Sequence, residues 1–146
     1  MVAGKTHALG RPIGWWLKEA DALLDATFED ALRGTGVDRR GWQVLASLAK
    51  RPTSRDDLVV SLAAFDAPSV VDGVVGGLQE KGWVEDSPAG LSLSPSGVLQ
   101  HRALATAVGA VRQKVSEALP PEDYEALIGL LARLVAALSP TDRYRP

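Results

Sequence analysis

Apolar residues recur every three or four positions along most of this chain, which is the spacing of helices that bury one face. Four helices are predicted in the first half of the chain: 12–34, 39–50, a short one that starts after Thr53, and 67–81. Asp38, Thr53 and Asp66 are expected to cap the last three, because their side-chain oxygens can accept hydrogen bonds from free backbone N–H groups. Pro12 suits a first turn, where its missing N–H is not needed.

After the fourth helix the spacing changes to a short alternation of apolar and polar residues. Residues 83–85 and 91–93 alternate in this way, and the turn sequence Ser-Pro-Ala-Gly at 87–90 separates them. That pattern predicts a small two-stranded hairpin. Helical spacing returns at residue 95 and continues to about 138, interrupted by the double proline at 120–121, so two further helices are predicted.

Composition narrows the class of protein. The chain has 146 residues, enough for one domain, and its 46% apolar and 23% charged residues are typical of a soluble globular protein. It has no cysteine and only two histidines, so we expect no disulfide, no metal centre and no cofactor. No apolar run approaches the roughly 20 residues of a membrane span, and since the first residues do not show a charged-then-apolar pattern we expect no leader sequence. These features predict a cytoplasmic protein that does not contact a membrane.

The order of the predicted elements, three short helices and a hairpin between longer terminal helices, is that of a winged helix-turn-helix. In its motifs the chain resembles the MarR family (multiple antibiotic resistance regulators), which are dimeric bacterial transcription factors. The resemblance covers about residues 12–138. The matching residues are Gly41-Trp42-Gln43-Val44-Leu45, Thr53 with Asp57-Leu58, Pro68-Ser69-Val70-Val71 with Val74 and Leu78, Gly82 with Val84-Glu85, and Leu93-Ser94-Pro95-Ser96-Gly97.

This resemblance implies a mainly α fold with a small β-hairpin wing. It implies a single MarR-like domain over residues 1–146, in which dimerisation helices at 12–34 and 95–138 flank a winged helix-turn-helix at 38–94. It further implies a homodimer that binds double-stranded DNA at a pseudo-palindromic operator and acts as a ligand-responsive repressor, with no enzymatic activity. A small aromatic or apolar effector would bind where the dimerisation and DNA-binding parts meet.

Tryptophans are the candidates for that effector pocket. Trp15, Trp16 and Trp42 lie on the helices that would line it. Aromatic residues at helical spacing more often pack in a core, and we favour that role for Trp16 and Trp42. Trp15 is adjacent to Trp16 and must point elsewhere, so a pocket and a dimer contact are equally expected for it.

Candidate DNA contacts follow from the way a helix enters the major groove, where the side chains of its first two turns reach base edges. On the fourth helix these side chains are Pro68, Ser69, Val70, Asp72 and Gly73. Basic side chains, hydroxyls and free N–H groups near the starts of the second and third helices would hold phosphates. The candidates for this role are Arg39, Arg40, Thr53, Ser54 and Arg55.

The distribution of charge favours a second hypothesis. Residues 53–97 hold two basic residues, Arg55 and Lys81, and seven acidic ones, and two minus seven gives a net charge of −5. The predicted wing has no arginine, and the first turns of the fourth helix have no Arg, Lys, Asn or Gln. Because phosphate neutralisation supplies much of the affinity for DNA, the alternative is a degenerate winged-helix scaffold that acts through protein or small-ligand binding.

Overall fold

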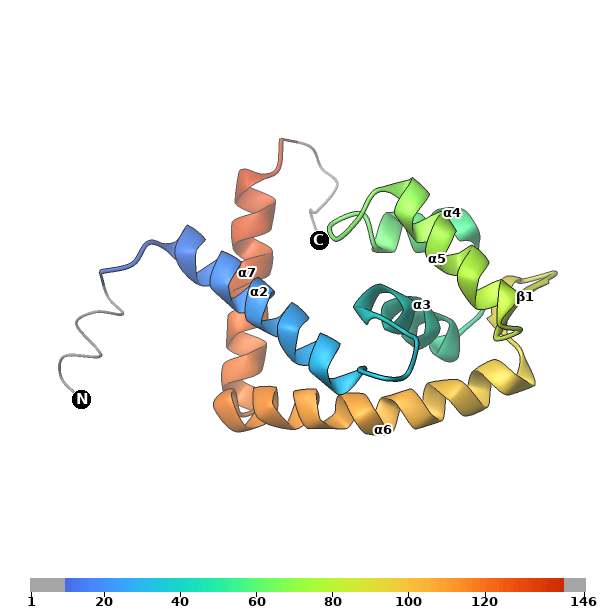
Figure 1. Ribbon diagram of the computed structural model, residues 1–146. Coiled ribbons are helices and arrows are strands. Elements are labelled where there is room, and N and C mark those ends of the chain that lie inside the picture. Colours follow the sequence, from blue (N-terminus) through green and yellow to red (C-terminus); the bar gives the residue numbers. More distant parts are fainter. Residues whose placement is uncertain (1–9, 141–146) are drawn as a thin grey trace. The chain divides into compact units, whose positions relative to one another are not determined.

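The computed structural model describes residues 10–140, and these form two compact units, of which the first ends at Val108 and the second begins at Gly109. The elements in chain order are α2 (Ile13–Ala31), α3 (Arg39–Lys50), α4 (Arg55–Ser61), α5 (Pro68–Glu80), β1 (Val84–Ser87), β2 (Gly90–Leu93), α6 (Pro95–Ala118) and α7 (Pro121–Leu138) (Figure 1). The predicted fold class, mainly α with a β-hairpin wing, is confirmed. The organisation as a single domain stays a prediction, and the unit boundary falls inside α6.

Side-chain caps explain where α3 and α4 begin. Asp38 caps α3 as predicted, because its Oδ1 accepts a hydrogen bond from the Gly41 N–H at 2.8 Å. The predicted cap of α4 is wrong by one residue. Ser54 caps this helix, since its Oγ accepts a hydrogen bond from the Asp57 N–H at 3.1 Å. The Thr53 backbone pairs with the wing, and its hydroxyl donates to the Arg51 carbonyl at 3.1 Å and does not cap α4.

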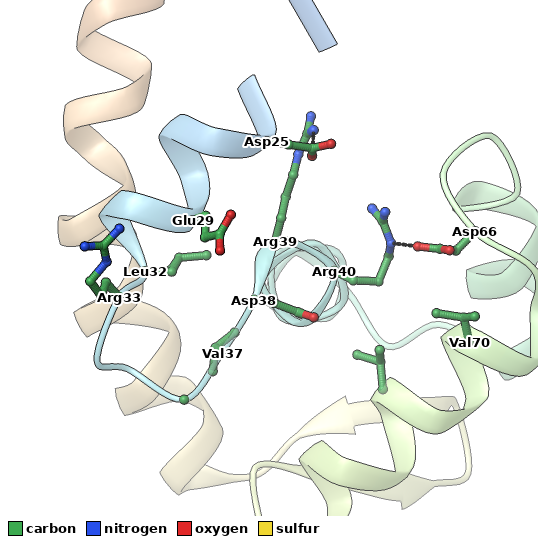
Figure 2. A pocket seen from close by; sticks show the side chains of 12 residues that line it. Asp25, Glu29, Leu32, Arg33, Val37, Asp38, Arg39, Arg40, Asp66 and Val70 are labelled. Carbon is green, nitrogen blue, oxygen red and sulfur yellow. Dashed lines mark hydrogen bonds and ion pairs between the residues drawn. The ribbon is translucent and has the colours of Figure 1, made fainter. Parts of the chain in front are cut away.

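The start of α5 also differs from the prediction. Ala67 occupies the N-cap position and makes no side-chain cap hydrogen bond, while Pro68 stands in the first turn as expected. Asp66 was the predicted cap. Its carboxylate instead accepts a hydrogen bond from Arg40 Nε at 2.6 Å (Figure 2). A tertiary ion pair has therefore displaced the local capping interaction.

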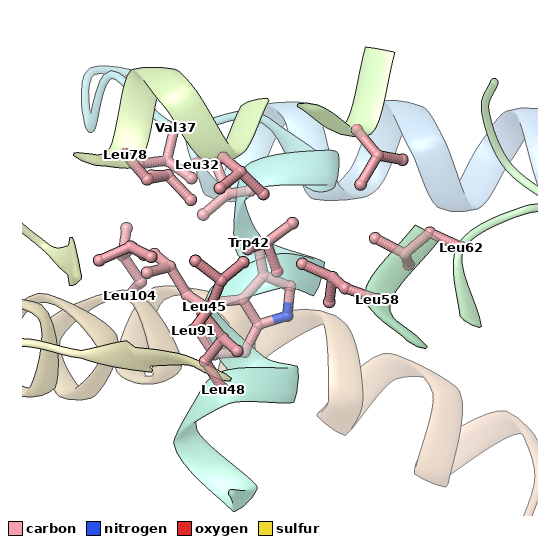
Figure 3. Close-up of a cluster of buried hydrophobic side chains, with 14 of the residues drawn as sticks. Leu32, Val37, Trp42, Leu45, Leu48, Leu58, Leu62, Leu78, Leu91 and Leu104 are labelled. Carbon is pink, nitrogen blue, oxygen red and sulfur yellow. The ribbon is translucent and has the colours of Figure 1, made fainter. Parts of the chain in front are cut away.

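The core of the first unit surrounds α3, and apolar side chains from all the other elements of the unit pack against it. Its buried members are Leu32, Val37, Trp42, Val44, Leu45, Leu48, Leu58, Leu62, Val71, Val75, Leu78, Val84, Leu91, Leu104 and Val108 (Figure 3). Trp42 is 4% exposed and stacks on His101 with ring centroids 5.1 Å apart, so its predicted core role is confirmed. Trp16 is 45% exposed, and the prediction that it packs in the core is wrong for the single chain.

The wing is joined to the helix-turn-helix by a short backbone bridge. The Thr53 N–H donates to the Leu91 carbonyl at 3.0 Å, and the Leu91 N–H donates to the Thr53 carbonyl at 2.9 Å. Thr53 thereby pairs with β2, which itself pairs antiparallel with β1. Gly90 has a φ of +119°, and an added Cβ there would lie 2.8 Å from the Thr53 carbonyl carbon. Glycine at this position allows the two backbones to meet.

The terminal helices expose broad apolar faces. Neither α2 nor α7 contains a buried residue over the ranges given above. The large exposed apolar residues of the two helices are Ile13, Trp16, Leu17, Leu23, Tyr124, Leu127, Ile128, Leu130, Val135 and Leu138. At 100° per residue, the apolar residues of α7 cover about half of its circumference, and Glu125 and Arg133 lie on the opposite side. These faces therefore lack cover within their own units.

Candidate nucleic-acid interface

Helices α4 and α5 form the helix-turn-helix, and α5 presents its first two turns to solvent. Val71 and Val75 are fully buried and anchor one side of α5 in the core. The five residues that were predicted to face DNA are all exposed: Pro68, Ser69, Val70, Asp72 and Gly73. The structure therefore places these predicted residues together on the free face of α5. Their contact with DNA stays a prediction.

One predicted phosphate ligand lies beside this face. Arg55 is the first residue of α4, and its Nη1 lies 3.5 Å from Asp72 Oδ1 on α5. The two side chains are 42% and 50% exposed. An ion pair as exposed as this contributes about 0–1 kcal/mol. Arg55 can therefore exchange Asp72 for another anion at little energetic cost.

Arg39 is placed differently, because its side chain is only 16% exposed. Its Nη1 pairs with Asp25 on α2 and lies 3.7 Å from Asp21. Its guanidinium carbon lies 5.0 Å from the ring centroid of Phe28 and 5.4 Å from that of Phe65. Its Nε is buried and has no hydrogen-bond partner among residues 10–140. Arg39 therefore joins α2 to α3 and to the turn before α5.

Arg40 is also largely enclosed, with a side chain that is 15% exposed. Besides its bond to Asp66, it donates from Nη1 to Gln43 Oε1, and its guanidinium carbon lies 4.9 Å from the Phe65 ring centroid. Both arginines were predicted to hold phosphates. Such a contact would require each of them to share or leave a carboxylate that it already binds.

Two further cations are more available, and of these only Lys50 was missed by the reasoning from sequence. Lys50 and Arg51 end α3 and are exposed, and within the described residues neither side chain has a hydrogen-bond or ion-pair partner. They line a hollow of about 700 Å³, here called the wing-side hollow, together with Ser47, Pro52, Thr53, Ser54, Asp57, Ser61 and Ala89. The adjacent basic pair before Pro52 was the signal in the sequence that marks them.

A second hollow, the interhelical cavity, lies between α2, α3 and α5 and measures about 520 Å³ (Figure 2). Leu32, Val37, Val70 and Val74 form its apolar wall. Its charged lining is Asp25, Glu29, Arg33, Asp38, Arg39, Arg40 and Asp66. Val70 and Val74 belong to α5, so an occupant would touch the helix whose free face is described above. Trp15, Trp16 and Trp42, the predicted pocket residues, do not line this cavity.

Two kinds of site are absent from the part of the chain that the structure describes. Residues 10–140 contain no group of three or more His, Asp or Glu side chains placed to hold a metal ion. None of the helices between these residues is long and apolar enough to span a bilayer.

Comparison with known proteins gives matches among solved structures. No family model matches the sequence, and no curated protein matches it significantly. A probable transcriptional regulator from Pseudomonas aeruginosa is 30% identical, with a TM-score of 0.69 over 86% of this chain and 98% of that chain. A MarR family protein of Mycobacterium tuberculosis, solved in complex with DNA, is 22% identical, with a TM-score of 0.66 over 85% and 98%. CouR from Rhodococcus jostii, bound to p-coumaroyl-CoA, is 20% identical, with a TM-score of 0.73 over 91% and 96%.

The hairpin beside a helix-turn-helix, the free face of α5 and these structural neighbours define a winged-helix transcriptional regulator, a class that is not enzymatic. The similarity to the Pseudomonas protein extends over almost the whole of that protein. The chain belongs to the MarR family of transcriptional regulators. The family resemblance that the sequence motifs indicate is thereby confirmed.

Proposed function

We propose that this protein is a homodimeric repressor that binds a pseudo-palindromic operator and releases it when a small ligand binds. The observation that carries this proposal is the exposure of the first two turns of α5, whose opposite side is anchored by Val71 and Val75. A helix held in this way is placed to enter a major groove. The DNA complex of the Mycobacterium relative and the ligand complex of CouR support both parts of the proposal.

Phosphate binding in this proposal comes mainly from Lys50, Arg51 and Arg55. All three are exposed, and they lie on either side of Thr53 and Ser54, whose predicted role as phosphate ligands we retain. The acidic charge of residues 53–97 opposes phosphate binding less than the net charge of −5 suggests. Asp66 is paired with Arg40, which comes from outside that window and changes the local net charge from −5 to −4.

The dimer in this proposal uses the apolar faces of α2 and α7. A two-fold dimer presents two copies of α5, and such paired helices bind half-sites about 34 Å apart, one turn of DNA. Homodimer interfaces that form with folding bury more than about 2,000 Å² in total and resemble a divided core. The exposed faces of α2 and α7 have this apolar character.

The test of DNA binding is fluorescence anisotropy with the DNA upstream of the protein's own gene and with random duplex, at several salt concentrations. Three cations in each of two subunits give six phosphate contacts, so the log–log salt slope is expected near −5, at about −0.9 per contact. Arg51→Ala should reduce the slope by about 2, because each dimer loses two contacts, whereas Arg133→Ala on α7 should leave it unchanged. Equal affinity for both duplexes would support the scaffold alternative instead.

Arg39→Ala is expected to affect stability more than DNA binding. It removes the ion pair with Asp25 and the packing against Phe28 and Phe65, and should lower the free energy of unfolding by about 1–2 kcal/mol. In calorimetry this corresponds to a decrease in Tm of about 2–8 °C. Arg55→Ala should show the opposite behaviour, with an unchanged Tm and weaker binding to all duplexes. A salt slope that falls in the Arg39→Ala protein would restore Arg39 as a phosphate ligand.

The ligand response is proposed to arise in the interhelical cavity, because its wall includes two residues of α5. Two compounds serve as probes. 6-Hydroxynicotinic acid regulates DNA binding by a Bordetella bronchiseptica protein of similar structure, and salicylic acid forms a complex with the Mycobacterium protein. Val74→Phe would fill the cavity from α5 and should abolish release of DNA by a probe while DNA binding persists. Release that survives this substitution unchanged would place the effector elsewhere, and Val98→Phe on α6 is the matched control.

A further inference from the structure

The free face of α5 carries very few groups that can read a base. Among its exposed residues from 67 to 73, only Ser69 and Asp72 have polar side chains. A hydroxyl both donates and accepts hydrogen bonds and so discriminates weakly, whereas an ionised carboxylate only accepts. Asp72 is therefore the side chain on this face whose partner must be a hydrogen-bond donor.

The major groove offers few donors to such a carboxylate. Guanine presents two acceptors and thymine presents an acceptor and a methyl group, so both repel or fail to bind a carboxylate. Adenine presents an amino group beside the N7 acceptor. Cytosine presents its N4 amino group without an acceptor of its own in the groove, and it is the base that Asp and Glu characteristically bind.

In the free protein Asp72 is held by Arg55. The pair joins α4 to α5 across the free face, at 3.5 Å, with both side chains about half exposed. A DNA phosphate competes for Arg55, because charge-assisted bonds from a guanidinium to a phosphate are strong and are often bidentate. When Arg55 turns to a phosphate, both carboxylate oxygens of Asp72 become free to accept.

On the basis of the proposed DNA-binding function, we infer that Asp72 determines base specificity by accepting a hydrogen bond from cytosine N4. Arg55 occupies Asp72 in the absence of DNA and leaves it for the phosphate backbone on binding. The move of Arg55 to a phosphate and the bond from cytosine to Asp72 depend on each other. Without a donor from a base, the Asp72 carboxylate would lie unpaired near the DNA phosphates, and binding would weaken.

The experiment selects duplexes from a randomised library with the full-length protein and with Asp72→Asn, and then measures affinities by anisotropy. Glu80→Gln is the matched control, because it removes one charge from the exposed far end of α5. The wild-type protein and Glu80→Gln should prefer cytosine at one symmetric position by at least about fivefold. Asp72→Asn should lose that preference, enrich adenine at the position and bind most duplexes more tightly, since an amide binds adenine bidentately and Arg55 is released.

Each result decides the inference. The same cytosine preference in the wild-type and Asp72→Asn proteins would overturn it while leaving the proposed function intact. Failure of the wild-type protein to select any sequence would overturn the proposed function and the inference together. Arg55→Ala should weaken binding to all selected duplexes and keep the cytosine preference, and loss of that preference would show that Arg55, and not Asp72, reads the base.

Discussion

Leu131→Arg is expected to halve the molecular mass of the protein in solution. Leu131 lies in the middle of the apolar half of α7, between the exposed side chains of Leu127 and Val135. An arginine buried there without a partner would cost about 3–5 kcal/mol and raise the dissociation constant of the dimer more than about a hundredfold. Light scattering at micromolar concentration measures the change directly.

Ala126→Arg is the matched control for this result. It adds the same side chain and the same charge to α7, on the side that carries Glu125 and Arg133. The control protein should remain dimeric, and both proteins should keep the helical circular dichroism of the wild type. A wild-type protein that is monomeric at micromolar concentration, or a Leu131→Arg protein that stays dimeric, would exclude α7 as the centre of the interface.

Gly97→Ala is expected to produce a large loss of stability. Gly97 lies in the first turn of α6, where an added Cβ would stand 2.0 Å from the carbonyl oxygen of Trp83. That oxygen accepts a hydrogen bond from the Ser94 N–H at 2.9 Å, and Ser94 Oγ accepts one from the Gly97 N–H at 3.0 Å. The methyl group would therefore force α6 away from the base of the wing.

The expected loss for Gly97→Ala is about 3 kcal/mol, at the upper end of overpacking effects, which corresponds to a decrease in Tm of about 6–12 °C. Gly109→Ala is the control within α6, because an added Cβ there meets nothing within 4 Å. It should stabilise the protein by up to about 1 kcal/mol through helix propensity. Equal melting temperatures for the two variants would contradict the close approach at Trp83.

The sequence predicted those parts of the fold that local spacing controls. Apolar periodicity and the Asp38 cap defined α3, and the double proline at 120–121 separated α6 from α7, because caps and breakers act within a few residues. The predicted caps at Thr53 and Asp66 were wrong because the interactions of these two residues depend on partners far away in the sequence. The Thr53 backbone pairs with Leu91 and the Asp66 carboxylate accepts from Arg40; these partners lie 38 and 26 residues away, and local patterns contain no information on them.

The candidate site also has some features that the local sequence predicts and others that it does not. The free face of α5 could be predicted, since the spacing of Val71 and Val75 decides which side is buried. The enclosure of Arg39 could not, because its partner Asp25 lies 14 residues away on another helix. The exposure of Trp16 could not be predicted either, because the periodicity of a face that packs within a chain is the same as that of a face that packs between chains.

Thr53 anchors the wing at Leu91, one residue pair from the tip, and the turn at Pro88 and Ala89 lies outside this anchor and is free to change in length. The hydrogen bonds to Leu91 are made beyond the turn at Pro88 and Ala89, so residues inserted at the turn would leave the helix-turn-helix in place. Lengthening a loop is inexpensive, since each doubling costs about 0.6 kcal/mol. An insertion that carries an arginine would give this short wing the reach and charge to enter a minor groove. The tip is thus the position at which evolution or an engineer can extend the DNA sequence that is read, without repacking the core.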